Sequence, residues 1–101
     1  MSRTTENQIA FAILQIASRN PNGIATFNQC YSDVPKYINL TAEDCAPSTT
    51  RPGELMWHQQ VRNIKSHDKD DGNFIKEKLL VHVDPPGYQI TEKGIILLRQ
   101  S

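Results

Sequence analysis

The sequence predicts a single α+β domain over residues 1–101, built mainly from helices with one β-hairpin towards the carboxyl end. Three observations predict this: the chain has 101 residues, 38% of them are apolar, and helical and strand-like patterns occur in separate segments. A chain of this length can bury one small core. Its 11 Lys and Arg balance its 11 Asp and Glu, which excludes a strongly basic protein that coats nucleic acid indiscriminately.

The first helix is predicted to run from Thr4 or Thr5 to about Arg19. Either threonine can cap it, because a short hydroxyl side chain accepts a hydrogen bond from the first-turn N–H groups. Apolar residues recur at helical spacing over 9–17. The segment Asn-Pro-Asn-Gly at 20–23 ends the helix.

A short second helix and a loop follow. Thr26 can cap a helix through 27–31, and Asp-Val-Pro at 33–35 interrupts it. Thr-Ala-Glu-Asp at 41–44 has the composition of a helix start that does not continue. Residues 46–53 form the most loop-like stretch of the chain.

The third helix is predicted over residues 54–67, which contain no Pro or Gly. Trp57, Val61 and Ile64 share one narrow face at helical spacing, which predicts that they enter the core. This phase also argues against stacking of Trp57 on a flipped or methylated base. The opposite face is polar and short of carboxylates, and it carries His58, Gln59, Arg62, Asn63 and Ser66.

A β-hairpin and a last helix complete the chain. Residues 79–83 have the β-branched content of a strand, with Leu79, Val81 and Val83 on one face. Asp-Pro-Pro-Gly at 84–87 makes the turn, and 88–90 return as the second strand. Thr91 can cap a helix over 92–100.

Three helices followed by a hairpin are the layout of a winged helix-turn-helix domain, in which the third helix enters the major groove. Four motifs support this layout: Leu40-Thr-x-Glu-Asp44, the Thr50-Arg-Pro-Gly53 loop, Trp57-x-x-x-Val-Arg-Asn-Ile64 and Gly87-Tyr-Gln-Ile-Thr-Glu-Lys-Gly94. Over about residues 8–98 the chain resembles the N-terminal winged-helix domain of Mrr-type restriction endonucleases and related modules of mobile-element proteins. The resemblance implies a winged-helix fold and a DNA-binding role. It does not imply cleavage, because in those enzymes cleavage belongs to a separate nuclease domain, for which these 101 residues leave no room.

The expected partner is double-stranded DNA. Arg can fork onto a guanine edge or a phosphate, and amides can pair with adenine. Hydroxyls and free N–H groups at a helix N-terminus suit a phosphate. The expected contact residues lie on the third helix and the loop before it: Thr50, Arg51, His58, Gln59, Arg62, Asn63, Lys65 and Ser66. Each of them taken alone is also an ordinary exposed polar residue.

The sequence gives little support for a metal site, an enzymatic activity or a membrane span. Cys30, Cys45 and the three His residues lack metal-ligand spacing, so we expect no metal and no other cofactor. No Gly-rich phosphate loop, GxSxG, HExxH or nuclease motif occurs, so we expect no enzymatic activity and no small-molecule substrate. The longest apolar run, Ile95–Leu98, is far too short for a membrane span, and two Cys do not suggest a disulfide framework. We therefore expect a cytoplasmic protein.

Two main hypotheses remain open. The first is a DNA-binding winged helix that senses sequence or base modification, either standing alone or as a module of a restriction or mobile-element protein, with a homodimer possible. The second is a winged helix for protein interaction or dimerisation without direct DNA contact. It is motivated by the zero net charge and by the absence of Lys and Arg from the hairpin tip at 84–87. Apolar residues near Tyr37, Ile38 and the last helix would then form the contact. A third, weaker hypothesis is an enzyme fragment whose catalytic part lies outside this chain.

Overall fold

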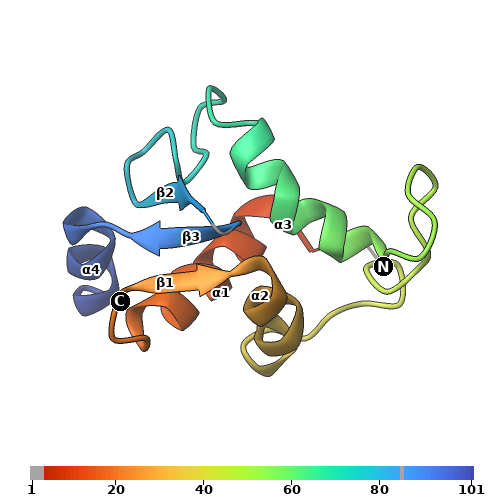
Figure 1. Ribbon diagram of the computed structural model, residues 1–101, viewed down its shortest axis with the longest axis horizontal. Helices are drawn as coiled ribbons and strands as arrows, with labels where there is room; N and C mark the ends of the chain where they lie inside the picture. Colours follow the sequence, from red (N-terminus) through yellow and green to blue (C-terminus); the bar gives the residue numbers. More distant parts are fainter. Residues whose placement is uncertain (1–3, 85) are drawn as a thin grey trace.

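The computed structural model describes residues 4–84 and 86–101, and within these residues it is an α+β fold of four α-helices and a three-stranded antiparallel sheet (Figure 1). The helical elements are α1 (Glu6–Ser18), α2 (Phe27–Asp33), the 3-10 turn η1 (Val34–Lys36), α3 (Met56–Ser66) and α4 (Glu92–Arg99). The strands are β1 (Ile24–Thr26), β2 (Leu80–Val83) and β3 (Gly87–Ile90). All four predicted helices are confirmed, to within about two residues at each end.

α1 is the central helix of the core, and its start confirms the predicted cap. The hydroxyl of Thr5 accepts a hydrogen bond from the Gln8 N–H (3.1 Å), and the Gln8 side chain accepts one from the Thr5 N–H (2.7 Å). The helix is buried around most of its circumference, at Ile9, Ala10, Ala12, Ile13, Leu14, Ile16 and Ala17. α1 therefore forms the surface on which the sheet and α3 pack.

The strand β1 is the main element that the sequence did not predict. It has only three residues and pairs with β3, which is the middle strand in the order β1-β3-β2. Gly87 allows this pairing, because a Cβ at that position would lie 2.7 Å from the Ala25 carbonyl oxygen and 2.9 Å from the Cα of Thr26. A strand this short shows no alternation of its own and forms through its pairing with β3.

The hairpin confirms the predicted β2 and β3 but corrects the face of β2. Leu80 is fully buried, while Val81 is 40% exposed and Val83 is half-buried, so the buried side chain of β2 is Leu80 and not one of its valines. The chain turns at Lys78, which has a φ of 63°, and the N–H groups of Leu79 and Leu80 both point to the Phe74 carbonyl oxygen. Leu79 therefore lies outside the strand, and β2 begins at Leu80.

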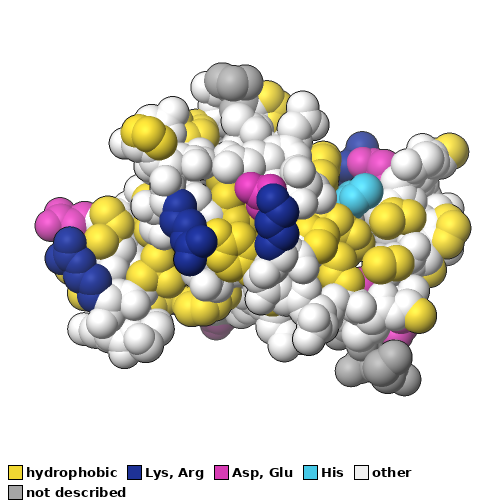
Figure 2. Space-filling view, turned by 90° about the horizontal axis from the view of Figure 1, so that it is seen from below, with side chains coloured by type: hydrophobic (Ala, Val, Ile, Leu, Met, Phe, Trp, Pro, Cys, Tyr) yellow, Lys and Arg dark blue, Asp and Glu magenta, His cyan; other side chains and the backbone are white. Residues whose placement is uncertain are grey.

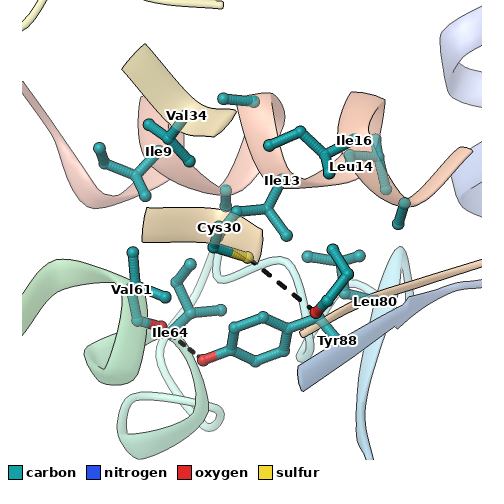
Figure 3. Packing of buried hydrophobic residues seen from close by; sticks show 14 of the residues in the cluster. Ile9, Ile13, Leu14, Ile16, Cys30, Val34, Val61, Ile64, Leu80 and Tyr88 are labelled. Atoms are coloured by element: carbon teal, nitrogen blue, oxygen red, sulfur yellow. Dashed lines mark hydrogen bonds between the residues drawn. The ribbon is translucent and has the colours of Figure 1, made fainter. Parts of the chain in front are cut away.

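Tyr88 connects the sheet to α3 (Figure 3). Its ring is fully buried, and its hydroxyl donates a hydrogen bond to the Val61 carbonyl oxygen (2.6 Å) and accepts one from the Lys65 N–H (3.2 Å). The predicted packing role of Tyr88 is confirmed. Because Val61 and Lys65 are four residues apart, the hydroxyl sits between two successive turns of α3 and fixes the height of the helix on the sheet.

The connection between α2 and α3 is organised by Asp44. This carboxylate is fully buried and accepts hydrogen bonds from the Thr4 N–H (2.8 Å), the Thr4 hydroxyl (2.5 Å) and the Thr41 N–H (2.8 Å). Burial alone would raise its pKa, but the hydrogen bonds from Thr4 and Thr41 outweigh this effect and lower it. Residues 42–45 form turns, as the interrupted helix start predicted.

Candidate nucleic-acid interface

Four of the expected contact residues share the outer face of α3. Opposite the buried Trp57, Val61 and Ile64, the helix presents side chains at the spacing i, i+3, i+4 and i+7, namely Gln59, Arg62, Asn63 and Ser66. The core position predicted for Trp57 is confirmed, since it is only 3% exposed. None of the four outer side chains is itself a carboxylate.

His58 does not lie on that outer face. Its ring is 4.6 Å from the ring of Tyr31 and 4.5 Å from that of Trp57, measured between centroids. Its Nδ1 accepts a hydrogen bond from the Leu55 N–H (3.4 Å) at the start of α3. Burial lowers the pKa of His58, so the ring is neutral near pH 7 and suits this acceptor role. His58 is therefore engaged in the contact between α2 and α3.

Arg62 is held by Glu54, a partner that the sequence did not reveal. Its two terminal nitrogens bond to the two carboxylate oxygens, with 2.8 Å between Nη2 and Oε2, and its side chain is only 17% exposed. This hydrogen-bonded contact lowers the pKa of Glu54 and raises that of Arg62. Arg51 is more open, with its Nε 4.0 Å from Glu54 Oε2. The positive charge of Arg62 on the outer face is thus paired with a carboxylate.

The loop before α3 is joined to the outer face by a network of hydroxyl and amide groups. The Ser48 hydroxyl accepts from the N–H groups of Thr50 (3.3 Å) and Arg51 (3.2 Å) and donates to Oε1 of Gln59 (3.2 Å). The Gln59 amide donates in turn to the Thr50 hydroxyl (3.2 Å). The structure therefore brings Thr50, Arg51 and Gln59 together, as expected. Lys65 is exposed on the flank of α3.

The first N–H groups of α3 are not free, which corrects the expected phosphate site at its N-terminus. The Met56 N–H donates to the Ala46 carbonyl oxygen (2.9 Å), and the Trp57 N–H donates to the Asp44 carbonyl oxygen (3.0 Å). The Leu55 N–H bonds to His58. Because the connection folds back over the helix start, any phosphate contact there must come from side chains.

On one face of the molecule the basic residues are scattered. On the face seen in Figure 2, Lys and Arg side chains stand apart from one another, with apolar and uncharged surface between them. At the hairpin tip, Asp84 and Pro86 are exposed, whereas Pro85 lies outside the described residues. Neither of the two exposed residues can bind a phosphate through a positive charge. The outer face of α3 and its loop are therefore the best candidate interface on this chain.

Comparison with known proteins gives no match: no family model, no curated protein and no solved structure is similar to this chain. Among the described residues, no helix combines the length and the apolar character needed to cross a membrane. The fold class is α+β, and the function has to be argued from the geometry of α3 and its surroundings.

Proposed function

We propose that this chain is a winged helix-turn-helix domain that binds duplex DNA with α3. The order of elements supports the fold, since three helices form a core and a hairpin follows the third of them. The strand β1 joins the hairpin in one antiparallel sheet, which gives the hairpin a fixed position beside α3. The chain departs from a simple helix-turn-helix in its connection: α2 ends at Asp33, and α3 begins only at Met56.

The observation that carries the proposal is the division of α3 into a buried apolar face and an outer face of amides, a hydroxyl and a guanidinium. At 1.5 Å per residue, the 11 residues of α3 span about 16 Å, and a helix of this kind fits a major groove about 12 Å wide. Amides and guanidinium groups are the side chains that read adenine and guanine edges. This composition suits base contacts better than non-specific attraction.

The ion pair between Arg62 and Glu54 affects how α3 would bind DNA. A carboxylate and a phosphate offer the guanidinium similar paired oxygen acceptors, so DNA must replace Glu54 before Arg62 can contact it. The exchange lowers affinity, because an existing contact is lost. Either a phosphate or the O6 and N7 atoms of guanine can supply the two acceptors, and only the guanine contact favours particular DNA sites.

The biological setting is proposed on the motifs alone. Their resemblance to the winged-helix domain of Mrr-type restriction endonucleases suggests a restriction, modification-sensing or mobile-element system. The structure gives the last of these motifs a physical basis: Gly87 permits the pairing with β1, Tyr88 bonds to α3, and Thr91 caps α4. Such contacts serve the fold and say nothing of the DNA sequence.

Fluorescence polarisation with labelled duplexes tests the proposal. The duplexes should vary in sequence and base methylation, and the titrations should be run at low and at moderate salt. We expect a modest affinity that falls only gradually with salt, because few phosphates are neutralised, and a loss of roughly tenfold in affinity for Arg62→Ala. Arg19→Ala is the matched control, since it removes the same charge from the far end of α1. Equal affinities of Arg62→Ala and the wild type would contradict the proposal.

A further inference from the structure

α4 carries a pair of adjacent, exposed apolar side chains. Among the described residues, the large apolar side chains that are clearly exposed are Val81 (40%), Ile95 (37%) and Ile96 (45%). The two isoleucines are adjacent on α4, whereas Tyr37 and Ile38 are partly buried against the core. The second hypothesis drawn from the sequence places the contact surface near Tyr37, Ile38 and the last helix. Of that predicted surface, the clearly exposed large apolar side chains are those of α4.

The orientation of α4 is fixed by its inner side. Gly94 packs so closely that a Cβ there would lie 2.6 Å from the Leu79 carbonyl oxygen and 2.9 Å from Cδ1 of Leu14. The Thr91 hydroxyl caps the helix by accepting the Gly94 N–H (3.0 Å). With Gly94 held inwards, the positions at i, i+3, i+4 and i+7 that start from Glu92 form the outer face.

This outer face consists of Glu92, Ile95, Ile96 and Arg99, a pattern with opposite charges at equal distances from an apolar centre. Neither Glu92 nor Arg99 forms an ion pair within the part of the chain that the structure describes. The neighbouring Lys93 bonds to the Glu77 carbonyl oxygen (2.9 Å) and lies off this face. Both charges and both isoleucines are therefore available to a partner.

We infer that α4 binds a second copy of this chain, with the two α4 helices antiparallel across a two-fold axis. An axis between Ile95 and Ile96 places Glu92 against the partner's Arg99 and Arg99 against the partner's Glu92. The isoleucines of the two copies then meet at the centre. The same face is thus complementary to itself in charge, with an apolar centre in both copies, and this property favours a second copy over an unrelated protein.

The dimer formed in this way is small. Two helices of two turns each bury less area than a standard protein interface, so we expect a dissociation constant on the order of tens of micromolar. Antiparallel packing also brings the positive end of each helix dipole near the negative end of the other. The inference does not rest on DNA binding and holds whether or not α3 contacts a duplex.

Sedimentation of the whole chain over micromolar to millimolar concentration tests the inference. We expect a reversible monomer–dimer equilibrium that Ile96→Gln weakens by roughly tenfold or more, because a polar group replaces the apolar centre. Val81→Thr is the matched control, since it changes an equally exposed apolar residue on β2 and should leave the equilibrium unchanged. Circular dichroism verifies that each variant remains folded. A wild type that stays monomeric at millimolar concentration would overturn the inference.

Charge reversal tests the antiparallel register. Glu92→Arg puts like charges opposite each other at both symmetric contacts, and so does Arg99→Glu, so each variant alone should dimerise roughly tenfold more weakly. A mixture of the two variants should form a heterodimer with wild-type affinity, because every contact again joins opposite charges. These exposed substitutions leave the core intact. A mixture that associates no better than either variant alone would overturn the antiparallel arrangement.

Discussion

α3 and α4 are both helices with a buried inner side, but they are held in different ways and present different outer faces. α3 is fixed by directional hydrogen bonds from Tyr88 to two of its turns, from Asn73 to its Ile64 carbonyl oxygen, and from its own Trp57 N–H to the connection. α4 is fixed by the close packing of Gly94 and by a threonine cap.

The outer faces of α3 and α4 also differ in the chemistry of their exposed side chains. α3 exposes amides, a hydroxyl and an arginine, and α4 exposes two isoleucines between opposite charges. Figure 1 shows α4 at the left end of the molecule and α3 on the other side of the strands, so the two helices lie apart. A small neutral chain can therefore keep a polar contact surface apart from an apolar one, because each helix is anchored on its inner side.

The largest expected effect comes from Asp44→Ala, which loosens the support of α3. The substitution leaves the Thr4 and Thr41 donors without their buried acceptor, so we expect a loss of roughly 3 kcal/mol in the free energy of unfolding. Urea denaturation measures it. Glu43→Ala, one residue away and exposed, should change little. Unchanged stability of Asp44→Ala would contradict the role given to this carboxylate.

The same carboxylate predicts a pH dependence. The folded-state pKa of Asp44 is lowered, so its contribution is fully present above the unfolded value of about 3.9 and is lost as the pH falls through the folded value. The stability of the wild type should therefore fall more steeply in acid than that of Asp44→Ala. Parallel curves for the two proteins below pH 4 would argue against a buried, ionised Asp44.

Gly94→Ala weakens the support of α4. The added methyl group would meet the Leu79 backbone, and we expect a net loss of roughly 2 kcal/mol even though alanine favours helices. Thermal unfolding measures the effect, with Ile95→Ala as the exposed neighbour for comparison. Self-association should weaken as well, because the outer face tilts. Stability equal to that of the wild type would mean that α4 packs less closely than described.

Tyr88→Phe removes one hydroxyl and leaves the ring in place. The Val61 carbonyl oxygen and the Lys65 N–H lose their shared partner, which predicts a loss of about 1–2 kcal/mol in unfolding free energy. DNA affinity should fall as well, since the height of α3 on the sheet is no longer fixed, while self-association through α4 should stay unchanged. Equal losses in both kinds of binding would contradict the separation of the two surfaces.

The smallest expected effect is an increase in DNA affinity. Glu54→Gln removes the charge that competes for Arg62, and we expect DNA affinity to rise by about threefold at low salt, with little change in stability because the pair is partly exposed. Fluorescence polarisation measures it, with Glu43→Gln as the control for the change in net charge. Weaker binding by Glu54→Gln would mean that Glu54 positions Arg62 for DNA instead of blocking it.

The sequence predicted the parts of the molecule that depend on periodicity. α1 and α3 show an apolar stripe, and the caps at Thr5, Thr26 and Thr91 follow from short-range chemistry. β1 escaped prediction because three residues carry no pattern and the strand forms only by pairing with β3. The exposed side of Val81 was also missed, since the strand alternation depends on a turn at Lys78.

The candidate site was predicted in composition and less well in geometry. Gln59, Arg62, Asn63 and Ser66 share a face because a helix fixes their spacing. His58 was placed with them, but it packs against Tyr31, a residue of α2 that the sequence does not place near α3. The partner of Arg62 was missed because Glu54 lies before the helix and reaches it through the fold of the loop. Side chains within one helix are thus predictable, and contacts between elements are not.

The most direct test of the account is a titration of the isotopically labelled protein with duplex DNA, followed by the amide resonances in NMR spectra. Binding by α3 predicts shift changes concentrated at residues 48–51 and 59–66, with the resonances of 92–99 unmoved at a concentration where the protein is monomeric. Shift changes centred on α4, or no change with any duplex at low salt, would contradict the claim that the outer face of α3 is the DNA-binding surface.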